Sequence, residues 1–217
     1  MATNTAGNCY LCGATMAKGA MKNHLIKVHG DCENGEECRV IKVEGVYEKG
    51  YWLLIDVPLN ETLDRVDHFL RMIWLECCGH MSQFCQAPWQ EEIPMDMKVK
   101  DLIHGEKFFH LYDFGTTTET LLTVVGAIRR PPQKGGVRLL ARNVPPVFAC
   151  GKCGKDAKYL SRDMDEPFYC GDCGDKFDMD EEQQLPIVNS PRMGECAYCG
   201  EADVFAFDPK ALAKKPE

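Results

Sequence analysis

The chain has 217 residues, a formal net charge of −8 and 45% hydrophobic residues. This composition is that of a globular rather than a disordered protein. The negative net charge argues against a generally basic protein that coats nucleic acid. It does not exclude local basic patches on the surface. Apolar runs are short, as in Trp52 to Ile55, and the N-terminal MATNTAGN lacks an apolar signal core. We therefore expect a cytoplasmic protein with no membrane span.

Cysteine is the unusual component, with 13 residues. In a chain with no signal peptide, cysteines favour metal binding over disulfides. Their density predicts three parts: a zinc finger and linker over 1–48, a central α+β domain over 49–145, and a zinc ribbon with a tail over 146–217. The Pro145-Pro146 pair marks the second junction.

The first candidate metal set has the form Cys9-x2-Cys12-x11-His24-x4-His29. Thiolate and imidazole are ligands that Zn²⁺ prefers, and this spacing is typical of a hairpin knuckle followed by a helix that carries both histidines. The sequence therefore predicts a structural zinc finger. Cys32 is an alternative to His29 as the fourth ligand.

The central part has the pattern of a mixed α and β domain. Thr62 is a suitable N-cap for a helix that ends at about Glu76, because apolar residues recur at helical spacing after it. Apolar or alternating segments predict strands over 51–57, 82–86, 107–114, 120–128 and 137–144. The Gly135-Gly136 pair predicts a turn that joins the last two strands into an antiparallel hairpin.

A short run of potential ligands, Cys77-Cys78-Gly79-His80, follows the predicted helix, with Cys85 nearby. Its spacing is poor for a metal site, and a Cys–His nucleophile pair would need an orienting acid such as Asp113. We interpret the run as a buried helix end and expect no catalytic residue in the chain.

Two segments, 10–30 and 120–155, contain no acidic residue. The readout positions of the finger would be Ala17, Ala20 and Asn23, which are poorly suited to sequence-specific base contacts. The basic side chains are therefore candidate contacts to a phosphate backbone, or alternatively a solvated hairpin surface. The candidates are Lys18, Lys22, Lys27, Arg129, Arg130, Arg138 and Arg142, with Lys134 in the same cluster.

The second metal set is Cys150-x2-Cys153-x16-Cys170-x2-Cys173. A glycine after each cysteine permits a tight knuckle turn. Two such pairs at this separation predict a zinc ribbon, and four thiolates leave no open position for catalysis. With the finger, this set leads us to expect two Zn²⁺ ions in each chain.

A last pair, Cys196-x2-Cys199, has no obvious partner in the sequence. It could replace one half of the ribbon or join Cys32 and Cys38 in a third zinc site. We favour the interpretation as reduced thiols, because an unpaired C-x2-C is weak evidence for a metal.

The runs TLDRVDHFLRMIWLECCGHMSQF (62–84) and KVKDLIHGEKFFHLYDFGTTTETLLTVV (98–125) resemble the plasmid pRiA4b ORF-3-like family, also known as the insertion-element passenger family. The resemblance covers about residues 50 to 145 and is most specific over 74–80 and 112–115. The segment LPIVNSPRMGECAYCG (185–200) looks like the extension of members with added zinc modules. The resemblance implies a two-layer α+β fold and no established catalytic residues.

Together these patterns predict an α+β protein in which a zinc finger and a zinc ribbon flank a central two-layer domain. The expected function is that of a non-enzymatic zinc-binding protein that contacts nucleic acid or a nucleoprotein assembly, such as the ribosome or the transcription machinery, without sequence-specific readout. The alternative is a protein–protein adaptor in which the zinc sites are purely structural.

Overall fold

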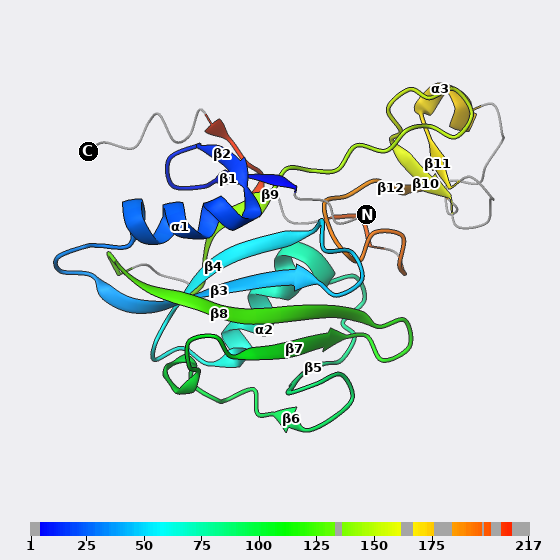
Figure 1. Cartoon of the computed structure of the whole chain (residues 1–217). Helices are drawn as coiled ribbons and strands as arrows, with labels where there is room; N and C mark the ends of the chain where they lie inside the picture. The colour runs from blue at the N-terminus through cyan, green and yellow to red at the C-terminus, as the bar shows by residue number, and fades with distance from the viewer. Residues whose placement is uncertain are drawn as a thin grey trace.

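The computed structural model describes residues 5–132, 136–161, 167–175, 184–196, 198–200 and 205–209. Most of these residues belong to an antiparallel sheet of nine strands in the order β2-β1-β9-β4-β3-β8-β7-β5-β6 (Figure 1). The strands are β1 (Ala6–Cys9), β2 (Thr15–Ala17), β3 (Glu36–Gly45), β4 (Trp52–Pro58), β5 (Ser82–Cys85), β6 (Glu92–Ile93), β7 (Lys107–Tyr112), β8 (Thr118–Arg130) and β9 (Arg138–Asn143).

Helices lie on both faces of this sheet. Alternate residues of β4 point to opposite sides: Leu53 and Ile55 join a core with α2 (Leu63–Leu70), whereas Trp52 and Leu54 join a second core with α1 (Lys18–His29). Burial on both faces explains why β4 is apolar at every position except Asp56, which is also buried. A large sheet with few helices is α+β-like, as expected. The predicted central domain has two layers, one helix layer on one sheet, and α1 adds a third layer on the other face of the sheet.

The helix predicted after Thr62 is present, with Thr62 as its N-cap. After Leu70 it continues as a single π-helical turn, η1 (Arg71–Leu75), in which the N–H of Glu76 donates to the carbonyl of Arg71. A short 3₁₀ turn, η2 (Val99–Asp101), precedes β7. The helix therefore ends within one residue of the predicted end, and a loop with Cys77 begins directly after it.

The predicted hairpin between residues 120–128 and 137–144 is wrong. Both strands exist, but β8 pairs with β3 and β7, whereas β9 pairs with β4 and β1. Strand β3 was not predicted from the sequence. It pairs with β8 from Glu36↔Arg130 to Gly45↔Thr120. It therefore takes the place beside β8 where β9 was expected. The predicted boundary at residue 48 also falls inside this one sheet, because β1, β2 and β3 are strands of it.

A second, smaller sheet has the strand order β11-β10-β12. Its elements are β10 (Tyr159–Ser161), β11 (Phe168–Tyr169), β12 (Gln184–Pro186) and the short helix α3 (Gly171–Gly174). Figure 1 shows this module at one end of the molecule, apart from the large sheet. Among the helices of the described residues, none is long and apolar enough to cross a membrane.

Candidate metal centres

The N-terminal cluster consists of Cys9, Cys12, His24 and His29, whose ligand atoms all lie within 4.8 Å of one another. Cys9 is the last residue of β1, Cys12 lies in the β1–β2 connection, and the two histidines belong to α1. The Sγ of Cys9 lies 3.8 Å from Nε2 of His29, and the Sγ of Cys12 lies 3.3 Å from Nε2 of His24. The predicted four residues are therefore together, and the alternative ligand Cys32 is not a member of the group.

The apolar face of α1 explains how this cluster is held. Met21 and Leu25 are fully buried and pack in the core that includes Trp52 and Leu54 of β4. Cys9 is also fully buried in that core, whereas Cys12 is exposed. The finger-like unit thus shares its core with the large sheet, and one edge of its metal cluster faces solvent.

The C-terminal cluster consists of Cys150, Cys153, Cys170 and Cys173, again within 4.8 Å of one another. It lies beside the small sheet, where β11 leads into α3. The sulfurs of Cys153 and Cys170 are 3.6 Å apart. The second predicted set of four is therefore also brought together.

Both clusters use the same backbone turn to present a cysteine pair. The N–H of Gly13 donates to the carbonyl of Cys9 and the N–H of Gly154 to the carbonyl of Cys150, at 2.9 and 2.8 Å. These two glycines have φ values of 80° and 73°, which residues with a Cβ rarely adopt. Glycine after the second cysteine is therefore what closes each knuckle.

The distances fit a tetrahedral metal site better than disulfides. Zn–S and Zn–N bond lengths imply separations of about 3.8 Å between two sulfurs and about 3.5 Å between sulfur and nitrogen. The separations given above run from 3.3 to 3.8 Å. A disulfide brings its sulfurs to about 2.05 Å, and none of the 13 cysteines, all of which lie in the described residues, forms one.

The pKa values of the clustered groups shift in both directions. A backbone N–H of Cys170 lowers the pKa of the Cys150 thiol to about 6, so that one thiolate forms readily. Hydrogen bonds with Cys153 and Cys170, with a smaller repulsion from the charge of Cys150, raise the pKa of the Cys173 thiol to about 12. Burial and the charge of His24 lower the pKa of His29, which favours the neutral imidazole that binds metals. A bound cation would remove the repulsion among the thiolates.

Sequence reasoning missed a third group, the central cluster of Cys77, Cys78, His80 and Cys196. The run after the helix was interpreted as a helix end, and Cys196 with Cys199 as reduced thiols. The fold joins Cys196, but not Cys199, to the run in a group that could hold a metal ion. Only long-range contact information could have revealed this, because Cys78 and Cys196 are 118 positions apart.

The basic candidates divide sharply by burial. Arg130 and Arg142 are 1% and 3% exposed, so the prediction that they contact a phosphate backbone is wrong. Arg130 is paired with Asp56, and Arg142 donates to the carbonyl of Asn189. Both arginines are buried and bind groups inside the protein. Because the large sheet is covered on both faces, the alternation of residues along a strand does not predict which side chains are exposed.

Two more candidates are engaged by carboxylates, and three stay accessible. Lys18 lies 2.6 Å from Glu44, and Arg138 donates two hydrogen bonds to Asp56. The accessible side chains are those of Lys22, which is partly exposed, and Lys27 and Arg129, which are exposed. Lys134 lies outside the described residues.

No protein-family model matches this sequence, and no curated protein matches it. Among solved structures, a protein of unknown function, MM3350 from Methanosarcina mazei Go1, is similar over 50% of this chain and 68% of its own. The identity is 16% and the TM-score is 0.40, so the likeness carries no argument about fold or function. The resemblance to the plasmid ORF-3-like family stays an expectation from sequence.

Proposed function

We propose that this chain is a non-enzymatic zinc-binding protein that contacts the phosphate backbone of a nucleic acid or nucleoprotein without reading its sequence. Zinc is the metal that tetrahedral sets of thiolate and imidazole favour. Four protein ligands in each cluster leave no open coordination position for a substrate, which supports a structural role. The zinc would fix the positions of the elements that carry the contact residues.

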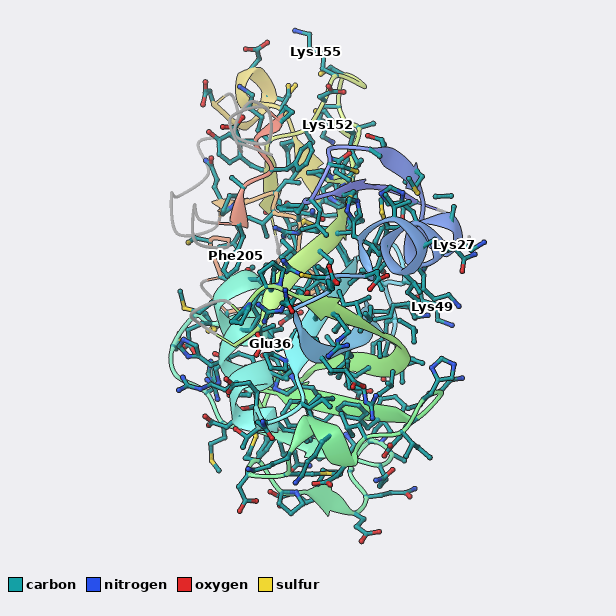
Figure 2. The ribbon with its side chains drawn as sticks, turned by 90° about the vertical axis from the view of Figure 1, so that its left-hand side faces the viewer. Lys27, Glu36, Lys49, Lys152, Lys155 and Phe205 are labelled. Atoms are coloured by element: carbon teal, nitrogen blue, oxygen red, sulfur yellow. The ribbon has the colours of Figure 1, made fainter. Side chains whose placement is uncertain are left out.

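The observation that carries the phosphate contact is the position of Arg129 beside the end of α1, the helix that carries Lys27. The N–H of Arg129 donates to the carbonyl of Gly30 at 2.9 Å, which fixes the end of α1 against the end of β8. Figure 2 shows Lys27 projecting outward from α1. Two exposed cations therefore lie at the same end of the sheet on a protein that is acidic overall, a polarity that favours weak, oriented binding of an anionic partner.

A hollow of about 280 Å³ lies at this same end. Its lining includes His29 of the N-terminal cluster, the arginines Arg129 and Arg138, and the acid Asp31. Occupation of the N-terminal cluster by zinc would thus order one wall of the proposed contact surface. This links the metal to binding without giving the metal a catalytic part.

Salt dependence of binding tests this function directly. We expect the wild-type chain to bind labelled single-stranded RNA or duplex DNA of mixed sequence at low salt. Arg129→Glu should lower the log–log salt slope by about 1, as should Lys27→Glu, because each removes one phosphate contact. The matched control is Lys107→Glu, which makes the same charge change at an exposed site on the neighbouring strand β7. Lys107 lies opposite Thr123 of β8, six residues before Arg129.

An unchanged slope in Arg129→Glu, an equal change in the control, or no binding by the wild-type chain would each contradict the proposal. The second candidate, a protein–protein adaptor, would then be favoured. One observation supports it independently: Trp89 and Phe114 are 54% and 41% exposed and contact each other edge to face at 5.6 Å. Exposed aromatic pairs of this kind are typical of interface anchors.

A further inference from the structure

The C-terminal segment around Cys196 is fastened to the end of η1 by side-chain hydrogen bonds. The Oγ of Ser190 donates to the carbonyl of Trp74 at 2.6 Å, and the hydroxyl of Tyr198 donates to the carbonyl of Ile73 at 3.3 Å. The last carbonyls of a helix have no partner within it, so these hydroxyls satisfy groups that the helix leaves open. Ser190 and Tyr198 are both buried, which makes this a built interface.

Arg192 of the same segment is 0% exposed, and its side chain packs against residues of the large sheet and its loops. Its Nη2 donates to Oδ2 of Asp113 at 2.7 Å and lies 3.5 Å from the Sγ of Cys77. Its Nη1 donates to the hydroxyl of Thr118, and its guanidinium lies 4.8 Å from the centre of the Tyr112 ring. A buried cation thus lies directly beside one sulfur of the central cluster.

The four donor atoms of the central cluster all lie within 4.8 Å of one another, close enough to share one metal ion. The sulfurs of Cys78 and Cys196 are 3.3 Å apart, and the Sγ of Cys196 is 3.6 Å from Nε2 of His80. Gly79 has a φ of 73°, which lets the chain reverse between Cys78 and His80 so that both point to one place. Cys196 itself has a φ of 52°, an uncommon conformation that the surrounding fold must hold.

We propose that Cys77, Cys78, His80 and Cys196 bind one structural Zn²⁺ ion that locks the C-terminal segment onto the large sheet. Binding would replace three thiol protons, which pass to solvent, and would leave the His80 imidazole neutral. Three thiolates and Zn²⁺ carry a net charge of −1, and the buried guanidinium of Arg192, which also pairs with Asp113, would lie beside the Cys77 thiolate of this centre. The chain therefore has a metal centre of its own where the two sequence-distant parts meet, separate from the finger and ribbon clusters.

The strongest competing state is a disulfide between Cys78 and Cys196. It would require the sulfurs to move from 3.3 Å to about 2.05 Å and would need an oxidant. It would also leave Cys77 and His80 without a shared function. Mass spectrometry of thiol-blocked, unreduced protein distinguishes the two states, because the disulfide lacks two alkylation sites.

The test compares Cys196→Ser with Cys199→Ser, a matched pair from one C-x2-C motif of which only the first lies in the cluster. We expect wild type and Cys199→Ser to hold equal amounts of zinc and Cys196→Ser to hold one ion fewer per chain. Amide hydrogen exchange of residues 189–196 should become faster in Cys196→Ser alone. Equal zinc in the two variants, or a Cys78–Cys196 disulfide in native protein, would overturn the proposal.

Cobalt substitution of the unaltered full chain gives a test that does not depend on a variant folding. The three clusters together contain nine thiolates, of which the central cluster supplies three. The near-ultraviolet sulfur-to-cobalt band should therefore grow through three equivalents of Co²⁺. Saturation after two equivalents would contradict a third centre. Cys78→Ser, which alters an exposed side chain, should reduce the saturating number from three to two.

Discussion

Arg130 on β8 and Asp56 on β4 form an ion pair in which both side chains are buried, with 2.8 Å between Nε and Oδ1. Arg138 contacts the other oxygen of the same carboxylate at 2.6 Å. Removing one partner of a buried pair leaves an uncompensated charge, which commonly costs about 3–5 kcal/mol. The pair thus connects strands β8 and β4 across β3, which lies between them in the sheet.

We therefore predict that Arg130→Gln lowers the free energy of unfolding by about 3–5 kcal/mol. The neighbouring substitution Arg129→Gln should change it by less than about 0.5 kcal/mol, because Arg129 is exposed. Urea unfolding of both variants, with the slopes compared, checks this. Similar midpoints for the two variants would show that the buried pair does not stabilise the sheet.

The fourth ligand of the N-terminal cluster can be tested by substitution. We expect His29→Ala to lose the metal of this cluster, whereas Cys32→Ser should keep it, because the ligand atoms of the group include those of His29 and not Cys32. The measurement is the zinc content of each purified variant relative to wild type. Loss of zinc from Cys32→Ser with retention in His29→Ala would reverse the assignment.

For the C-terminal cluster we predict that Cys153→Ser unfolds the small sheet and leaves the large one intact. A structural zinc contributes on the order of 10 kcal/mol to a module too small to fold alone. Limited proteolysis should cut the variant within 150–175 while the nine-stranded sheet stays resistant. Unchanged protease resistance of the small sheet would argue against a metal in this cluster.

Asp67 gives a prediction about pH. Burial alone would raise the pKa of this carboxyl, but its hydrogen bond to His110, with contacts to Ser82 and Arg71, lowers it to about 2. A lowered pKa in the folded state stabilises the protein above the unfolded pKa, near 4, and this stabilisation disappears as pH falls towards 2.

Asp67→Asn should therefore lower the free energy of unfolding by about 2 kcal/mol at pH 7, and the difference from wild type should shrink between pH 4 and pH 2. Denaturant melts of both proteins at several pH values measure this. A difference that stays constant down to pH 2 would exclude the proposed ionised hydrogen-bond network around Asp67.

Local patterns were enough to predict much of this structure. The knuckle motifs at Cys9 and Cys150 are encoded within a few residues, so their spacing identified two clusters whose members the fold does bring together. The N-cap at Thr62 and strand β4 were also predicted, because helical periodicity and the apolar run from Trp52 to Ile55 are local signals.

The features that were missed depend on tertiary neighbours. The position of β3 beside β8 separates β8 from β9, and the Gly135-Gly136 pair in the sequence gives no sign of this. Arg130 is buried because Asp56, far away in the sequence, lies beside it. Cys196 lies beside Cys78 because its segment, which includes Ser190, packs on η1. Spacing along the chain carries none of this information.

The central claim is that twelve cysteine and histidine side chains hold three zinc ions in each chain. Native mass spectrometry of the full chain, purified under reducing conditions without added metal, measures this number directly. The account predicts a principal species whose mass exceeds that of the acid-denatured chain by three zinc ions, less the protons released. A principal species with two zinc ions or fewer would contradict it.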